Sequence, residues 1–327
     1  MKAVQCMEFG SVEDLSVSDI EPAPLKDSEV RIRVRACGIN FPDMLIVSGQ
    51  HQMKPPLPFV PGGEVAGTVS AVGAGVTDLG PGDNVVAVTY LGGLAEYVNA
   101  PRGAVHPWPS GMPVEQAAAF NGVYATAYHA LKQRAVLQDG ETLLVLGAAG
   151  GVGLAAVQLG LAMGARVIAG AGSEAKIRFL RAGGAHEVVN YDADNLRDEL
   201  RSLAGRRGVD VVCDPVGGGL FAQAARCMAW NGRLLVLGFA SGLIPDFPVN
   251  LGLLKGASVV GVNYGRFVEE QPDDAAHNIR ELLGLYADGQ LDPHVSRVFP
   301  MSEAAAAMNC LKNREAIGKI VVTVSRD

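Results

Sequence analysis

Paired cysteines are missing from this sequence of 327 residues. The five cysteines are odd in number, and no two form a CxxC pair: Cys6, Cys37, Cys213, Cys227 and Cys310. This distribution predicts neither a disulfide framework nor a zinc ribbon and is typical of the reducing cytoplasm. The segment MKAVQCMEFG also lacks the apolar core and the small-residue cleavage site of a secretory signal. We therefore expect a cytoplasmic protein.

Blocks of lysine or arginine are also missing. Lys and Arg number 27 against 34 Asp and Glu, which gives a formal net charge of -7 at pH 7. A balance of this sign argues against a surface for nucleic acid or for an anionic membrane. Hydrophobic residues make up 49% of the chain, enough for the cores of about two domains. The expected partner is a small molecule.

One apolar run is long enough to raise the question of a membrane span. Between residues 143 and 165 only Gln158 is polar, and about 20 such residues can cross a bilayer. Gly147, Gly150, Gly151 and Gly153 lie within about one and a half helical turns and would weaken a continuous helix, each by up to ~1 kcal/mol. The pattern instead favours a buried strand (142–146), a tight turn, a helix (152–163) and a second strand (166–169).

The glycine turn of this βαβ unit is close to the dinucleotide fingerprint GxGxxG. Ala148 takes the first glycine position, and Gly150 and Gly153 take the others. Glycine lets the backbone approach a ligand closely, and the N–H groups that begin the next helix attract a pyrophosphate. The residues expected to bind the cofactor here are Gly147, Ala148, Ala149, Gly150, Gly151, Val152 and Gly153.

The end of the second strand indicates which dinucleotide is bound. An NAD-selective site carries an acid about 20 residues after the glycines, whereas this strand ends in GAGS (170–173). Ser173 is a predicted helix N-cap, which places Lys176 in a first turn where the helix dipole disfavours a cation. A 2′-phosphate on both residues would explain the lysine and favours NADPH. The alternative is a solvated lysine offset by Glu174. Further candidates for this pocket are Gly172, Tyr191 and Arg178.

Apolar runs alternate with helical segments further along the chain. VDVVCDPVGG (209–218), GRLLVLGFASG (232–242) and ASVVGVNYG (257–265) each end in small residues or a turn. With the βαβ unit they predict an α/β fold with a doubly wound parallel sheet, whose ligands lie at the carboxyl ends of the strands. Cofactor contacts are therefore also expected from Gly238, Phe239 and Asn263.

The first hundred residues predict a different architecture. VRIRVRA (30–36) alternates apolar and charged residues, as an antiparallel strand with one wet face does. More short strand patterns separated by Gly and Pro follow, so we expect a second, mostly β domain. The C-terminal segment predicts helices at about 274–287 and 302–312, the latter capped by Ser302, and a closing strand KIVVTV that returns to the first domain.

The chain resembles a known family over nearly its whole length. GINFPDMLIVSG, KPPLPFVPGGEVAGTVSAVG, GLAEYV, YATAYHALKQRAVLQDGETLLVLGAAGGVGLAAVQLG and IGKIVV are similar to zinc-independent medium-chain dehydrogenases/reductases of the NADPH:quinone oxidoreductase (zeta-crystallin-like) group. The resemblance implies a GroES-like catalytic domain (1–122 and 266–327) and a Rossmann NADPH-binding domain (123–265), with the active site in the cleft between them. It also implies a homodimer paired through the edge strand in VVGVNYG.

The resemblance also predicts that no metal is bound. Zinc alcohol dehydrogenases of this superfamily have a ligand Cys where this chain has Asn40, and a ligand His where it has Gly63. The cysteine-rich structural zinc lobe is absent, and the six histidines show no ligand spacing. Without a Lewis acid to acidify an alcohol, alcohol oxidation is not expected.

For catalysis the resemblance implies residues from two segments. Asn40 and Asp43 line the cleft in this family: Asn40 contacts cofactor and substrate as an amide donor, and Asp43 orients its neighbours. The alternative is a turn-stabilising pair within NFPD. Tyr124 and Thr126 resemble residues that pack near the nicotinamide, and Tyr124 is also a candidate proton donor.

Three functions remain open at this point. The first is an NADPH-dependent quinone reductase, and the second is an enone or enoyl-thioester (C=C) reductase, which needs a donor for the developing enolate. The third is a non-catalytic NADPH-binding protein. Leu45 and His51 stand where members of the quinone group carry aromatic residues, and they leave the choice of acceptor open.

Overall fold

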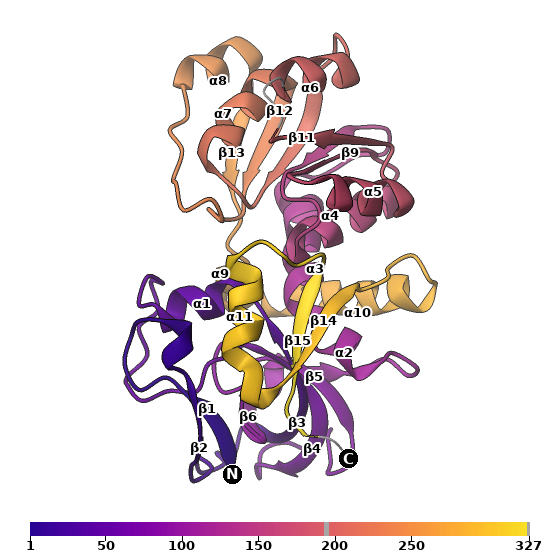
Figure 1. Cartoon of the computed structure of the whole chain (residues 1–327). Coiled ribbons are helices and arrows are strands. Elements are labelled where there is room, and N and C mark those ends of the chain that lie inside the picture. Colours follow the sequence, from indigo (N-terminus) through magenta and orange to yellow (C-terminus); the bar gives the residue numbers. More distant parts are fainter. Residues whose placement is uncertain (193–195, 326–327) are drawn as a thin grey trace. The chain divides into compact units, whose positions relative to one another are not determined.

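A computed structural model describes residues 1–192 and 196–325 of the chain. Two compact units are present (Figure 1). The first consists of Met1–Gly122 and Pro293–Asp327, and the second of Val123–Asp292.

The second unit is built on a six-stranded sheet in the order β10-β9-β8-β11-β12-β13. All its pairings are parallel. The strand order reverses between β8 and β11, which is the Rossmann arrangement and its switch point. The predicted doubly wound parallel sheet is confirmed. Its strands are β8 (Thr142–Val145), β9 (Arg166–Ala171), β10 (Glu187–Asn190), β11 (Val209–Asp214), β12 (Met228–Val236) and β13 (Ser258–Gly261).

Helices connect these strands and cover the sheet. The apolar run forms β8, α4 and β9, as predicted, and α5 begins directly after its Ser173 cap. The core contains fully buried side chains from the central strands, such as Leu144, Ile168 and Val212. Within residues 1–192 and 196–325, none of the helices combines the length and the apolar composition that a membrane span requires. The connecting helices are α4 (Gly151–Ala162), α5 (Glu174–Ala182), α6 (Leu196–Ala204), α7 (Gly218–Cys227) and α8 (Val249–Lys255).

The second unit extends to Asp292, beyond the boundary expected at residue 265. The reason is that α9 (Tyr264–Glu270) and α10 (Pro272–Ala287) pack on α3 (Asn121–His129) and the π-helical turn that follows it. Phe267 stacks on His129 with ring centroids 3.9 Å apart. Gln133 Nε2 donates to Asn278 Oδ1 at 2.9 Å. These apolar and polar contacts attach both helices to the second unit.

The first unit contains a seven-stranded sheet in the order β14-β15-β3-β4-β5-β7, with β6 paired to β3, and a two-stranded sheet of β1 (Lys2–Gln5) and β2 (Ser16–Asp19). All pairings are antiparallel except that of β14 with β15. The expectation of a mostly β domain is confirmed. The strands of the larger sheet are β3 (Glu29–Ile39), β4 (Glu64–Val72), β5 (Asn84–Val88), β6 (Tyr97–Pro101), β7 (Val105–Pro107), β14 (Val295–Pro300) and β15 (Lys319–Thr323).

The chain's C-terminal segment returns to this sheet. β15 pairs antiparallel with β3, with Ile320 opposite Ile39. Three short helices complete the unit: α1 (Phe41–Val47), α2 (Val114–Ala117) and α11 (Ala304–Lys312). The predicted cap at Ser302 is wrong, because a 3-10 turn (Met301–Glu303) comes before α11 and its N-cap is Glu303.

Candidate functional site

The glycine turn between β8 and α4 is built for close packing. Gly147 has a φ of 59°, a left-handed conformation that glycine adopts at no steric cost. A Cβ on Gly153 would clash with the carbonyl oxygen of Gly147 and lie 2.8 Å from the Cα of Ala148. The helix therefore starts directly against the turn, as a dinucleotide fingerprint requires.

The start of α4 is open to an anion. Its N-cap is Gly150, which provides no side-chain cap, and no acidic residue lies in the first turn. A Cβ on Gly150 would find only the Gly147 carbonyl within 4 Å, at 3.3 Å. The amides of Gly151, Val152 and Gly153 begin a buried 12-residue helix, and the helix dipole favours negative charge there. These features fit a pyrophosphate.

The β9–α5 connection brings together the other predicted cofactor residues. Ser173 caps α5 by accepting from the Lys176 backbone N–H at 3.4 Å, and the Lys176 side chain is half-buried. A Cβ on Gly172 would lie 3.0 Å from the Tyr191 ring, so Tyr191 joins this pocket from the end of β10. Arg178 is exposed on α5.

Asp192 is a neighbour that the sequence did not reveal. Its Oδ2 would lie 2.7 Å from a Cβ on Gly172, and the residue is exposed. Strand β9 itself carries no carboxylate at its end, as expected, but the turn after β10 supplies one beside it. A carboxylate here opposes a 2′-phosphate, whereas Ser173 and Lys176 favour it.

The remaining predicted cofactor residues also follow the carboxyl ends of strands. Gly238 and Phe239 come after β12, and Phe239 lies beside Gly217 in the β11–α7 turn. Asn263 follows β13 and caps α9 by accepting from the Arg266 N–H at 3.0 Å. The predicted cofactor residues that follow strands of this unit therefore all lie at the carboxyl ends of the parallel strands.

Asp214 holds the turn after β11 in place, at the switch point. It is 1% exposed, and its Oδ1 accepts from the backbone N–H groups of Val216 at 2.7 Å and Gly217 at 2.9 Å. Burial raises the pKa of this carboxyl. The sequence prediction did not include it, although an acid at the end of an otherwise apolar strand is a usable signal.

Tyr124 and Thr126 lie on α3. The Tyr124 hydroxyl is buried and donates to Gln158 Oε1 at 2.8 Å, and burial raises its pKa above the ordinary tyrosine value. A phenol in this state does not release its proton readily, so the geometry favours a packing role for Tyr124. Thr126 is half-buried.

A buried polar cluster in the first unit surrounds the other predicted residues. Lys319, 4% exposed, donates from Nζ to Asn40 Oδ1 at 2.6 Å and to Glu64 Oε2 at 3.1 Å. Asn40 Nδ2 donates to the same Glu64 oxygen at 3.0 Å. Glu64 Oε1 also accepts from the Gly122 N–H at 2.6 Å. Both ends of the Asn40 amide are thus engaged, which orients the residue but leaves little donor capacity for a substrate oxygen.

Asp43 completes this cluster from the first turn of α1. It is 3% exposed and accepts from the Asn40 backbone N–H at 2.7 Å. Burial raises its pKa to about 7, and the nearby Glu64 carboxylate acts in the same direction while Lys319 opposes it. Asn40 and Asp43 therefore stabilise the turn at the start of α1, which is the contact that the alternative interpretation of NFPD predicts. The Asp43 carboxyl is also a titratable group next to Asn40.

The raised pKa of Asp43 predicts a pH dependence. The folded chain keeps this proton up to a pH of about 7, whereas an unperturbed carboxyl loses it near 3.8. Because the folded state binds more protons in this window, the contribution of Asp43 to stability falls as the pH rises from 4 to 7, by up to ~1.4 kcal/mol per pH unit. Urea unfolding at several pH values should show this slope in the wild type and lose it in Asp43→Asn. Parallel pH profiles for the two proteins would contradict it.

Two residues that bear on acceptor choice lie near this cluster in sequence. Leu45 is half-buried on α1. His51 is half-buried, and its Nδ1 accepts from the Met53 N–H at 3.0 Å. A neutral His51 therefore carries its proton on Nε2.

Metal-binding geometry is not found. Within residues 1–192 and 196–325, no group of three His, Cys, Asp or Glu side chains could hold a metal ion. At Asn40, where a thiolate is expected in a zinc enzyme, the side chain is an amide bound to Lys319 and Glu64.

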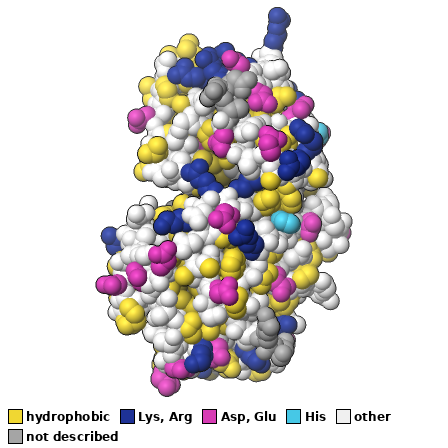
Figure 2. Space-filling model, viewed as in Figure 1, with side chains coloured by type: hydrophobic (Ala, Val, Ile, Leu, Met, Phe, Trp, Pro, Cys, Tyr) yellow, Lys and Arg dark blue, Asp and Glu magenta, His cyan; other side chains and the backbone are white. Residues whose placement is uncertain are grey.

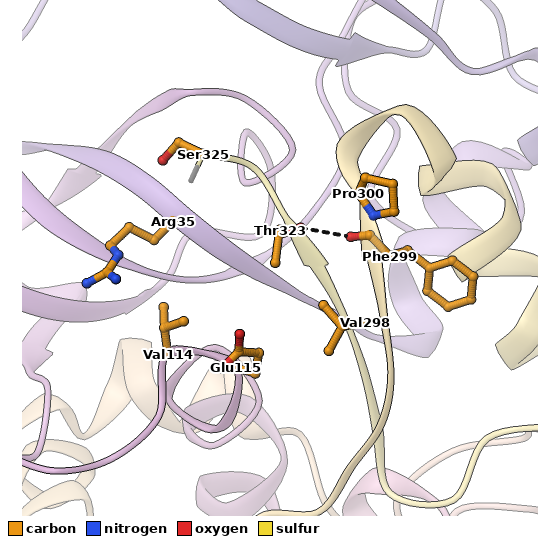
Figure 3. Close-up of a pocket in the computed structure, with 8 residues that line it drawn as sticks. All are labelled: Arg35, Val114, Glu115, Val298, Phe299, Pro300, Thr323 and Ser325. Atoms are coloured by element: carbon orange, nitrogen blue, oxygen red, sulfur yellow. Dashed lines mark hydrogen bonds between the residues drawn. The ribbon is translucent and has the colours of Figure 1, made fainter. Parts of the chain in front are cut away.

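A separate cavity of about 400 Å³ opens in the first unit (Figure 3). Arg35 and Glu115 line it from β3 and α2, and Val298 and Thr323 line it from β14 and β15. Thr323 Oγ1 donates to the Phe299 carbonyl at 3.3 Å. None of the predicted site residues lines this cavity, so it is not part of the candidate site.

Comparisons with known proteins agree with both units. Residues 26–110 match a family model described as an alcohol dehydrogenase GroES-like domain, and residues 151–282 match one described as a zinc-binding dehydrogenase. The chain is 39% identical to a quinone oxidoreductase-like protein 2 homolog of Nematostella vectensis, over 99% of this chain and 89% of that one.

Solved structures show the same similarity. Escherichia coli quinone oxidoreductase complexed with NADPH has a TM-score of 0.92 and 29% identity, with coverage of 99% of this chain and 100% of that one. The CurK enoyl reductase has a TM-score of 0.90 and 27% identity, with 98% of both chains covered.

Proposed function

Because this chain is an oxidoreductase of the quinone oxidoreductase family, within the medium-chain dehydrogenases/reductases, we propose that it reduces a quinone with NADPH and without zinc. The observation that carries the proposal is the open start of α4 behind a glycine turn, together with the Ser173 and Lys176 pair on α5. The NADPH bound in the Escherichia coli structure supports the cofactor, and the names of the relatives support the acceptor.

In this proposal the chain's residues bind and orient the reactants. The first amides of α4 bind the pyrophosphate, and Ser173 and Lys176 bind the 2′-phosphate. Bound NADPH supplies a hydride. The Asn40, Glu64 and Lys319 cluster keeps the β3–α1 corner rigid, and it offers neither a thiolate nor an imidazole to a metal. A quinone needs no Lewis acid, since water can protonate its reduced oxygen, so positioning supplies most of the catalysis.

Turnover by the chelator-treated protein tests the reaction. We expect NADPH oxidation with a small quinone to continue unchanged after chelation. If only a small enone is reduced, the second candidate, a C=C reductase similar to the CurK enoyl reductase, replaces the first. Turnover that stops on chelation and returns with zinc would contradict the metal-free proposal. Binding of NADPH without turnover of either acceptor would support the non-catalytic alternative.

Lys176 and Asp192 should change cofactor preference in opposite directions. Lys176→Met should raise the KM for NADPH by about tenfold, which corresponds to ~1.4 kcal/mol, because it removes a cation from the 2′-phosphate. Asp192→Asn should lower the KM for NADPH, because it removes the opposing carboxylate. Neither variant should change the KM for NADH by a comparable factor. Steady-state kinetics with both cofactors checks this, with the exposed Lys26→Met as a matched control; equal changes for NADPH and NADH would exclude a 2′-phosphate contact.

We also propose a homodimer in the cytoplasm. Strand β13 is an edge of the six-stranded sheet, and exposed apolar side chains lie in the preceding segment: Leu243, Ile244, Val249 and Leu253. Such a patch is typical of a protein interface. All five cysteines are free and buried, which supports a reducing compartment. Light scattering should give twice the 34.1 kDa chain mass and a reduced mass for Val259→Asp. A monomeric wild type would contradict the dimer.

A further inference from the structure

A cationic cavity of about 330 Å³ lies in the second unit, away from the dinucleotide turn. It is lined where α6, α7 and α8 end and where β11 and β12 begin. The glycine turn instead follows the carboxyl end of β8, and all these strands are parallel. The cavity therefore lies at the amino ends of the strands and the turn lies at their carboxyl ends. The length of the six-residue strand β11, roughly 15–20 Å, separates them.

Five positive side chains line this cavity. Figure 2 shows Lys and Arg side chains gathered at the end of this unit where Figure 1 labels α6 and α8. Arg207 pairs with Asp210, and Lys255 Nζ donates to the Met228 carbonyl at 2.5 Å. No carboxylate of the described residues forms an ion pair with Arg201, Arg206 or Arg226. The cationic lining is Arg201, Arg206, Arg207, Arg226 and Lys255.

The surroundings do not neutralise this charge. Arg201, Arg226 and Lys255 lie in the last turns of their helices, whose ends each carry about half a negative charge. Asp210 contributes one further negative charge at Arg207, and Asp198 acts on the neighbouring Cys227. An excess of about two positive charges remains, which matches one phosphate group at neutral pH.

An aromatic side chain stands beside the cations. Trp230 lines the same cavity and is 69% exposed. Its ring lies against Gly256, where a Cβ would come within 3.4 Å of it. Exposed indoles with neighbouring arginines provide the stacking surface and the phosphate donors that nucleotides use.

We propose that this cavity is a second ligand site and binds a phosphorylated ligand with a flat ring, of the nucleotide class. The phosphates lie on Arg206 and Arg226, and the ring lies on Trp230. The site is separate from the dinucleotide turn, so both can be occupied at once.

Trp230 is a natural reporter of this site. The chain has two tryptophans, so Trp108→Phe leaves Trp230 as the only one. Titration of this variant with ATP, with the dinucleotide turn saturated by NADP⁺, should give saturable quenching in the millimolar range or tighter. Arg206→Ser/Arg226→Ser should weaken ATP binding at least tenfold and leave the KM for NADPH unchanged, while the exposed Arg280→Ser should bind ATP as before. Calorimetry on the unsubstituted chain repeats the measurement without reliance on Trp108→Phe.

Competing probes separate the parts of the proposal. Inorganic triphosphate should displace ATP, and adenosine alone should bind more weakly than ATP. Sodium sulfate at equal ionic strength should compete with ATP more weakly than triphosphate does. Sulfate that displaces ATP as effectively as triphosphate would mean that the cavity binds any small anion, and it would overturn the assignment to the nucleotide class. Adenosine binding as tightly as ATP would overturn the role of the arginines, and an absence of saturable ATP binding would overturn the proposal as a whole.

Discussion

Replacing Lys319 by methionine lowers the free energy of unfolding of the chain by about 3–5 kcal/mol. The Lys319 ammonium is 4% exposed and donates to the Ile39 carbonyl, Asn40 and Glu64. Without it, the Glu64 carboxylate, which is 1% exposed, is left buried with no cation to compensate its charge. The large cost comes from this uncompensated charge, since the net contribution of an intact buried pair is small.

A double variant and a surface pair test that explanation. Lys319→Met/Glu64→Gln removes both charges and should recover a large part of the lost stability. Lys2→Met breaks the exposed pair with Asp19 and should leave the urea midpoint nearly unchanged. If Lys319→Met and Lys2→Met shift the midpoint equally, or if the double variant is the least stable of all, the buried charge is not the cause.

The sequence predicted the Rossmann sheet well because its signals are local. The glycine turn, the Ser173 cap and the apolar runs each specify a strand or a helix from neighbouring residues, and α5 begins directly after the predicted cap. The boundary near residue 265 was a different kind of inference. It depended on contacts such as that of Gln133 with Asn278, which join segments far apart in the sequence.

The site was harder to predict for the same reason. The NFPD segment identified Asn40 and Asp43, but the partner that orients Asn40 is Lys319, 279 residues away. Asp192 reaches the end of β9 from the turn that follows the neighbouring strand β10. Charged residues stand at the first position of two apolar strands, KIVVT and EVAGTV. This is a usable signal for Lys319 and Glu64, although the sequence prediction included neither residue. Which of them meet could be read only from the pairing of β15 and β4 with β3.

Gly153→Ala should reduce the affinity for NADPH at least a hundredfold, or about 2.7 kcal/mol. The added methyl group clashes with the Gly147 carbonyl and comes within 2.8 Å of the Ala148 Cα. Both are backbone atoms, so no side-chain rotation relieves the clash. The start of α4 must move away from the turn, and its amides then no longer converge on one phosphate position. Fluorescence titration with NADPH measures the loss.

Two other glycines make this experiment specific. Gly150→Ala meets only one atom, the Gly147 carbonyl at 3.3 Å, so it should fold normally and weaken NADPH binding through crowding of the phosphate position alone. Gly284→Ala, on α10, has nothing within 4 Å of the new Cβ and should bind NADPH as the wild type does, with equal or greater stability because alanine favours a helix. Wild-type affinity in Gly153→Ala would show that the cofactor does not depend on this turn, and the proposed NADPH site would then be wrong.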